Sequence, residues 1–91
     1  MIRSFRSKAL KLFAETGNPS KLPVQNPARV RLILAALESA SEPERMNLPG
    51  LRFHGLHGNP KRYAVDASGN YRVTFGFDGK DAVQVDIEDY H

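Results

Sequence analysis

Residues 71–87 read YRVTFGFDGKDAVQVDI, and this stretch decides the fold of the 91-residue chain. Apolar side chains stand at every second position, from Tyr71 to Phe77 and again from Val83 to Ile87. A period of two is that of a β-strand with one buried face. The stretch therefore predicts two antiparallel strands with their odd-numbered residues in the core.

The turn between these strands has more than one possible register. A two-residue turn at Asp78 and Gly79 would place Val73 opposite Gln84 and mix the two faces. A three-residue loop of residues 78–80 places Val73 opposite Val85. Face alternation favours the three-residue loop, and a β-bulge is the alternative that would also restore the faces.

Two more strands are expected upstream. Leu51 alternates with Arg52 in the first, and Tyr63 and Val65 alternate with polar neighbours in the second. Pairing Val65 with Tyr71 leaves Ala-Ser-Gly at 67–69 as a three-residue loop with glycine in its last position. The connections are short, so all four strands are expected to be antiparallel.

Two helices are expected before the sheet, after a short strand at residues 2–5. The apolar stripe of the first helix falls at Phe5, Ala9, Leu12 and Phe13, and Gly17 ends it. Asn26 and Pro27 suit the cap and first position of the second helix. Its stripe falls at Val30, Ile33, Leu34 and Leu37. The prediction is a single α+β domain, residues 1–91, with two N-terminal helices packed on a small, mainly antiparallel twisted sheet.

Charge is distributed unevenly along the chain. Residues 1–62 hold eleven Lys and Arg against four acidic residues, whereas residues 63–91 hold two against six. A basic surface of this kind is suited to a polyanion. The cations expected to contact the phosphates of a nucleic acid are Lys8, Lys11, Lys21, Arg29, Arg31 and Arg62. The alternative is a solvated surface with uneven charge.

The even positions of the strands face away from the predicted core, and they carry reactive groups. Arg72 and Tyr90 share this parity. His54 points to the opposite face from Leu51 and Phe53, so it too faces away from the core. Arginine can neutralise charge that builds up on a phosphate, and histidine can transfer a proton near neutral pH. These three residues predict a phosphodiester-cleaving face, although most surface histidines and strand arginines are merely solvated.

The sequence gives little support for other kinds of functional site. The chain has no cysteine, so thiolate metal sites and disulfides are excluded. His54 and His57 differ in strand parity, which argues against a shared zinc ion. We expect neither a cofactor nor a metal, no membrane segment, no signal peptide and a cytoplasmic location.

The segments MIRSF (1–5), HGLHG (54–58), NYRVTF (70–75) and EDYH (88–91) resemble the HigB-type toxins of the RelE/HigB superfamily, found in bacterial toxin–antitoxin pairs. The resemblance covers essentially the whole chain. It implies a compact RelE-like fold and a ribosome-dependent endoribonuclease that cuts mRNA without a metal and so inhibits translation. It also implies a cognate helix-turn-helix antitoxin, which would provide the only link to operator DNA.

The resemblance also implies five active-site residues: His54, Arg72, Asp89, Tyr90 and His91. His54 is the expected base, and His91, between two negative charges, the expected acid or phosphate-binding cation. Asp89 would orient an imidazole, while Tyr90 could transfer a proton or stack on a base. The chain departs from the family pattern at His57, where lysine is common, at Gly55, where proline is frequent, and at Tyr71, where tryptophan is common. A catalytically inactive RNA-binding module with this fold is the alternative.

Overall fold

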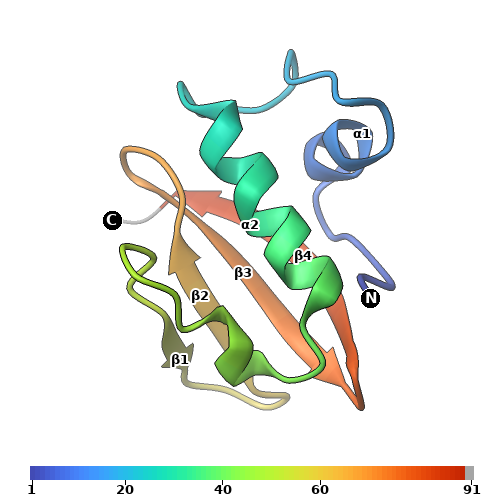
Figure 1. Cartoon of the computed structure of the whole chain (residues 1–91), viewed down its shortest axis with the longest axis vertical. Helices are drawn as coiled ribbons and strands as arrows, with labels where there is room; N and C mark the ends of the chain where they lie inside the picture. Colours follow the sequence, from blue (N-terminus) through green and yellow to red (C-terminus); the bar gives the residue numbers. More distant parts are fainter. Residues whose placement is uncertain (90–91) are drawn as a thin grey trace.

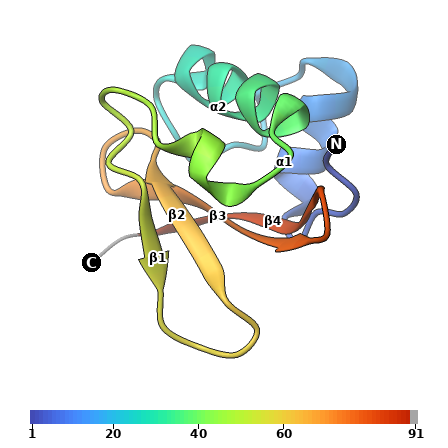
Figure 2. The same cartoon turned by 60° about the horizontal axis from the view of Figure 1, so that its bottom comes forward.

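The computed structural model describes residues 1–89. Its elements follow the order α1 (Lys8–Thr16), α2 (Pro27–Ser39), the 3-10 turn η1 (Pro43–Met46), β1 (His54–Leu56), β2 (Arg62–Asp66), β3 (Tyr71–Asp78) and β4 (Asp81–Asp89). The strands form one antiparallel sheet in the order β1-β2-β3-β4. Both helices lie on one side of this sheet, and the β1–β2 hairpin curls to the other side (Figures 1 and 2). The predicted α+β architecture is confirmed.

The core lies between α2 and the sheet. Asn26 caps α2 by accepting from the Arg29 backbone N–H, and Pro27 occupies its first turn. The predicted stripe of α2 is buried at all four positions, against side chains that include Val73 and Phe75 of β3. Each fully buried aliphatic side chain contributes about 1.5–3 kcal/mol. This packing fixes which face of the sheet remains open.

Helix α1 begins later than its apolar stripe predicts. The Ser7 side chain accepts from the Leu10 backbone N–H, so Ser7 is the N-cap and Phe5 lies outside the helix. Leu10 is fully buried, while Leu12 is only partly buried. The predicted stripe is therefore wrong at its start, because a capping hydroxyl sets the first turn. Gly17 ends the helix in the left-handed conformation, as predicted.

The N-terminal segment runs beside β4 as a parallel edge. Ile2 pairs with Ala82 and Phe5 pairs with Val85 in isolated bridges. Arg3 binds the carboxylates of Asp78 and Asp81, each at 2.8 Å. The expected extended segment at residues 2–5 is thus present as two bridges, and it brings the next residue, Arg6, to the edge of the sheet.

A β-bulge sets the register between β3 and β4. Asp78 pairs with Asp81, so the turn has two residues, but further along Val73 pairs with Ile87. The extra residue on β4 is accommodated near Gln84, whose φ is 51°. The expected pairing of Val73 with Val85 is wrong, and the bulge restores the faces instead. Before the bulge, Ala82 is buried and Val83 lies in register with Gly76.

The remaining connections also differ from the predictions in detail. Val65 pairs with Val73 rather than Tyr71, a shift of two residues that keeps the same face. The first strand begins at His54 rather than Leu51. Arg52 has a φ of 53°, a left-handed conformation that strands do not use, and it ends the extended run before His54. Within residues 1–89, no helix has the length and apolar character needed to cross a membrane.

Candidate active site

The face of the sheet away from the helices carries two of the predicted catalytic residues. His54 pairs with Ala64, which pairs with Thr74, and this row crosses three strands. Arg72 lies one row further along, in register with Glu88. Neighbouring strands lie about 4.8 Å apart and residues along a strand about 3.4 Å, so the backbones of His54 and Arg72 are roughly 12 Å apart on one face. Both side chains are long enough to reach a phosphate placed between them.

His54 has a defined proton arrangement. Its Nδ1 lies 2.8 Å from the Arg52 carbonyl oxygen, which can only accept a hydrogen bond. Nδ1 therefore donates and carries the proton of the neutral ring. Nε2 keeps its lone pair and is the atom that can accept a proton from substrate. The geometry supports the assignment of His54 as the base.

The carbonyl that orients His54 belongs to a strained residue. Arg52 adopts the left-handed conformation, which costs a residue with a Cβ about 1–2 kcal/mol. Two contacts hold it there: Arg52 Nε lies 3.5 Å from Asp66 Oδ2, and the Asp66 N–H donates to the Leu51 carbonyl at 2.7 Å. Asp66, at the end of β2, thus holds Arg52 in place, and the Arg52 carbonyl in turn orients His54.

A polar network covers the middle of the same face. Arg62 Nη2 donates to Thr74 Oγ1 at 3.0 Å and to the Gln84 carbonyl at 2.9 Å. Thr74, which is fully buried, donates in turn to Glu88 Oε2. Burial lowers the pKa of Arg62, and the neighbouring Arg6 lowers it further, while Glu88 opposes both effects. The network fixes Arg62 beside the row that contains His54.

Arg72 stands between two acidic side chains of the neighbouring strands. The register places Asp66 of β2 on one side and Glu88 of β4 on the other. Opposite charges on adjacent strands stabilise a sheet and keep a guanidinium in a narrow range of positions. From this position the guanidinium of Arg72 can stabilise negative charge on a phosphate that reaches the open face.

The C-terminal candidates are placed differently. Asp89 is in register with Tyr71, an odd position, and both line a hollow beside residues 23–25 on the helix side of the sheet. Strand alternation thus places Asp89 on the other face from His54 and Arg72. Tyr90 and His91 lie outside the described residues. Strand β4 continues beyond Ile87, which packs against the core.

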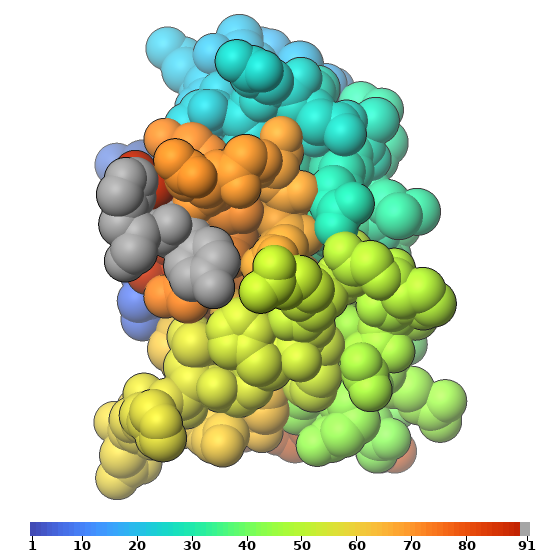
Figure 3. All heavy atoms as spheres, turned by 90° about the vertical axis from the view of Figure 1, so that its left-hand side faces the viewer, coloured from blue at the N-terminus to red at the C-terminus, as the bar shows by residue number. Residues whose placement is uncertain are grey.

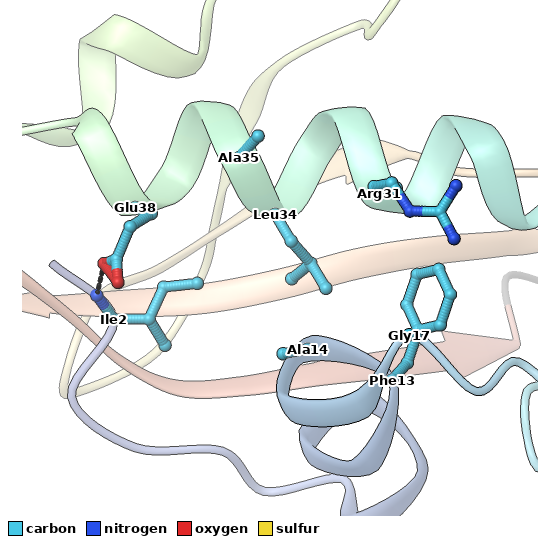
Figure 4. A pocket seen from close by; sticks show the side chains of 8 residues that line it. All are labelled: Ile2, Phe13, Ala14, Gly17, Arg31, Leu34, Ala35 and Glu38. Carbon is cyan, nitrogen blue, oxygen red and sulfur yellow. Dashed lines mark hydrogen bonds between the residues drawn. The ribbon is translucent and has the colours of Figure 1, made fainter.

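The six predicted RNA-binding cations have different environments. Lys8, Lys11 and Lys21 are exposed. The guanidinium of Arg31 is exposed and lies 5.2 Å from the centre of the Phe13 ring, in the groove between α1 and α2 (Figure 4). Arg29 instead donates to the Gly50 and Asp66 carbonyls, which ties α2 to the loop before β1 and to the end of β2.

Sequence reasoning missed two residues that shape this face. Arg52 carried no signal beyond its alternation with Leu51, because a left-handed conformation at a non-glycine residue depends on its tertiary contacts. The sequence did not indicate a role for Arg6, because Arg6 comes near Arg62 only when the N-terminal segment pairs with β4. Within the described chain, no group of three or more His, Asp or Glu residues is placed to hold a metal ion.

Comparison with known proteins identifies the family of the chain. Residues 3–91 match the family model described as the RelE-like toxin HigB of type II toxin–antitoxin systems. The chain is also similar to the protein named Endoribonuclease HigB from Proteus vulgaris, with 37% identity over 92 residues and complete coverage of both chains. The chain belongs to the HigB family of RelE-like toxins of type II toxin–antitoxin systems.

Proposed function

We propose that this protein is a toxin that cleaves mRNA on the ribosome as a metal-independent endoribonuclease. The observation that carries the proposal is an oriented base and a cation on the same face of the sheet: Nε2 of His54 has its lone pair available, and Arg72 shares that face. The similarity to Endoribonuclease HigB supports the reaction class.

The mechanism uses the 2′-hydroxyl of the RNA as nucleophile. His54 Nε2 takes the proton from that hydroxyl, and the 2′-oxygen forms a bond to phosphorus. The bond from phosphorus to the 5′-oxygen breaks, and that oxygen receives a proton from the acid, for which His91 is our candidate. The products are a 2′,3′-cyclic phosphate and a 5′-hydroxyl. Arg72 stabilises the negative charge that increases on the phosphate oxygens.

Asp89 and Tyr90 have supporting roles in this proposal. Asp89 orients or charge-stabilises an imidazole. Tyr90 either lends its phenol to proton transfer or stacks on a base, as aromatic side chains do in RNA-binding proteins. Cations at Lys8, Lys11, Lys21, Arg31 and Arg62 supply contacts to phosphates, with Arg62 beside the reacting groups.

The test of the reaction type is a message with a single 2′-deoxy substitution at the cut site. Wild-type protein should cut the ribose message and leave the substituted one intact, because the nucleophile is missing. His54→Ala should lose about 10²–10⁴ in rate on the ribose message. Excess chelator, with ribosomes shown to remain assembled, should leave the chemistry unaffected. Cleavage of the substituted message would contradict the proposal.

The proposed partners follow from family membership. A cognate antitoxin with a helix-turn-helix fold neutralises the toxin, and the pair reaches operator DNA only through the antitoxin. The ribosome and its mRNA are the targets, which places the protein in the cytoplasm. Co-expression with the neighbouring reading frame should restore growth that the toxin alone arrests. Growth arrest that also occurs with the His54→Ala variant would point to the alternative, a binding module without catalysis.

A further inference from the structure

A second hollow lies on the open face of the sheet, next to the part of this face that carries His54 and Arg72. It has a volume of about 360 Å³. The β1–β2 loop, residues 57–61, forms one wall, and the loop projects away from α2 (Figures 2 and 3). Gly76 of β3 and the bulged segment of β4 form the opposite side, and Arg6 contributes from the N-terminal segment.

The lining of this hollow is basic. Arg6, Lys61, Arg62 and His57 contribute to it, and none of the residues that line it is acidic. Arg6 makes no side-chain hydrogen bond or ion pair to residues 1–89. It lies close enough to Arg62 to help lower the pKa of that guanidinium, although burial is the larger cause. Two adjacent cations repel each other; Glu88 and Asp86 offset part of this repulsion at Arg62, and an anion in the hollow would offset more of it.

The β-bulge in β4 shapes one side of the hollow. The bulge turns the Gln84 carbonyl toward Arg62 Nη2, which fixes the guanidinium and leaves Nη1 and Nε without a hydrogen-bond partner among residues 1–89. Gly76 keeps the floor open: a Cβ there would lie 3.5 Å from the Lys61 carbonyl oxygen and 3.6 Å from Val83 Cγ2. A guanidinium with free, directed N–H groups suits the oxygens of a phosphate.

Arg62 links the hollow to the candidate active site. Arg62 bonds to Thr74, which lies in the same row of the sheet as His54. Arg62 itself is two residues along β2 from that row, a distance of about 7 Å. A single RNA strand that crosses the His54–Arg72 face can therefore continue past Arg62. Proteins bind single strands by such basic tracks along the backbone.

We propose that the hollow between Arg6 and Arg62 binds a phosphate group of single-stranded RNA next to the phosphate that is attacked. The proposal rests on the endoribonuclease function above. RNA is favoured over an acidic segment of a protein partner because the hollow adjoins the reacting groups, where RNA must lie. The phosphate can come from the message or from ribosomal RNA, and the experiments separate these sources.

The first experiment measures binding without cleavage. A 2′-O-methyl RNA octamer, which cannot be cut, is titrated into the isotope-labelled chain and followed by amide NMR. The Gly76 and Gln84 amides should shift. Arg6→Gln should weaken binding about fivefold or more and reduce the salt slope by about 0.7. Lys80→Gln, which removes an exposed charge from the β3–β4 turn, is the matched control and should bind as wild type does.

Two results of this titration would exclude a phosphate of the message from the hollow. One is an octamer that shifts the His54 and Arg72 amides but leaves Gly76 and Gln84 in place. The other is Arg6→Gln binding as tightly as the Lys80→Gln control. If Arg6→Gln also binds empty ribosomes as tightly as the Lys80→Gln control does, the hollow binds no RNA phosphate and the proposal is overturned, even if the protein cuts RNA normally. Absence of cleavage by wild type, with the Gly76 and Gln84 shifts intact, would refute the endoribonuclease function and leave the phosphate site standing.

A second experiment separates the source of the phosphate and the class of partner. Binding of Arg6→Gln is compared for the free octamer, for empty ribosomes and for the antitoxin. Weakening with the octamer identifies a message phosphate, and weakening only with ribosomes identifies a ribosomal one. Weakening only with the antitoxin would overturn the proposal in favour of an acidic protein segment. Gly76→Ala, which adds a methyl group to the floor without steric overlap, should weaken RNA binding less than Arg6→Gln does.

Discussion

At the scale of single residues, the proposed mechanism depends on how His54 is held. Its Nδ1 donates to the carbonyl of Arg52, a residue in the left-handed conformation. The acceptor is a main-chain atom, so it survives any side-chain change at position 52. What a substitution there changes is the cost of keeping that backbone conformation.

The conformational cost predicts different stabilities for two variants at position 52. Arg52→Ala keeps the strained Cβ and loses the contact with Asp66, whereas Arg52→Gly loses the contact but removes the strain. Arg52→Gly should therefore be more stable than Arg52→Ala by about 1 kcal/mol in denaturant unfolding. The same two changes at Lys80, which has no positive φ, are the control. Equal stability of the two position-52 variants would argue against strain.

The C-terminal residues predict a second outcome at this scale. Tyr90→Phe removes the phenol hydroxyl. A chain that ends at Asp89 removes the side chains of both Tyr90 and His91. Loss of an acid–base group should cost about 10²–10⁴ in cleavage rate, which is more than a packing change costs in a folded protein. Full activity of both variants would show that the C-terminal site does not exist. Full activity of Tyr90→Phe alone would leave stacking as the role of Tyr90.

At the scale of elements, the N-terminal segment is attached to β4 by charge as well as by backbone bridges. Arg3 hydrogen-bonds to Asp81, which lowers the pKa of that carboxyl below 3.8, and the N-terminal ammonium adds to the effect. Since the folded-state pKa is the lower one, the stabilisation is present above about pH 3.8 and is lost as the pH falls through the folded value. This attachment is also what holds Arg6 near Arg62.

The attachment predicts a pH-dependent difference in melting temperature. Asp81→Asn should melt below wild type at about pH 6, and the difference should shrink as the pH falls through the lowered pKa of Asp81, because wild-type Asp81 then becomes protonated as well. Thermal unfolding followed by circular dichroism measures it. Glu44→Gln is the control, since Glu44 forms no ion pair within residues 1–89. A difference that stays constant with pH would rule out the ionic contribution.

At the scale of the whole molecule, the two faces of the sheet have separate tasks. The helix side holds the core, and the open side holds His54, Arg72 and the Arg62 network. Exposed lysines of α1 and the following loop add charge beyond this face. Binding to a ribosome should then depend on both a local site and a wider electrostatic surface.

This division predicts which cations affect the salt dependence of ribosome binding. Lys8→Gln, Lys11→Gln and Lys21→Gln should each reduce the slope of log K against log salt by about 0.7 for a contact with single-stranded RNA. Arg29→Gln should leave the slope nearly unchanged and lower stability instead, because its guanidinium binds two main-chain carbonyls. Binding that is insensitive to salt would refute the electrostatic surface. A reduced slope in a fully stable Arg29→Gln would reassign that residue to RNA.

The sequence by itself determined the α+β class, the capped and amphipathic α2, and the shared face of His54 and Arg72. These features follow from local rules: a period of two or of 3.6, and a cap residue before a proline. Side-chain parity survives errors of two residues in register, which is why the face assignment was right although Val65 pairs with Val73 and not with Tyr71. The start of α1 was wrong because a single hydroxyl, that of Ser7, outweighs one apolar position.

Only the tertiary structure decided the bulge at Gln84, the left-handed Arg52 and the approach of Arg6 to Arg62. Each of these depends on contacts between residues far apart in the chain: Gln84 with Ser4, Arg52 with Asp66, and the N-terminal segment with β4. A period in the sequence reports which side of an element is buried. It contains no information on which distant element supplies the partner, and in this protein those partners orient the base and shape the hollow beside it.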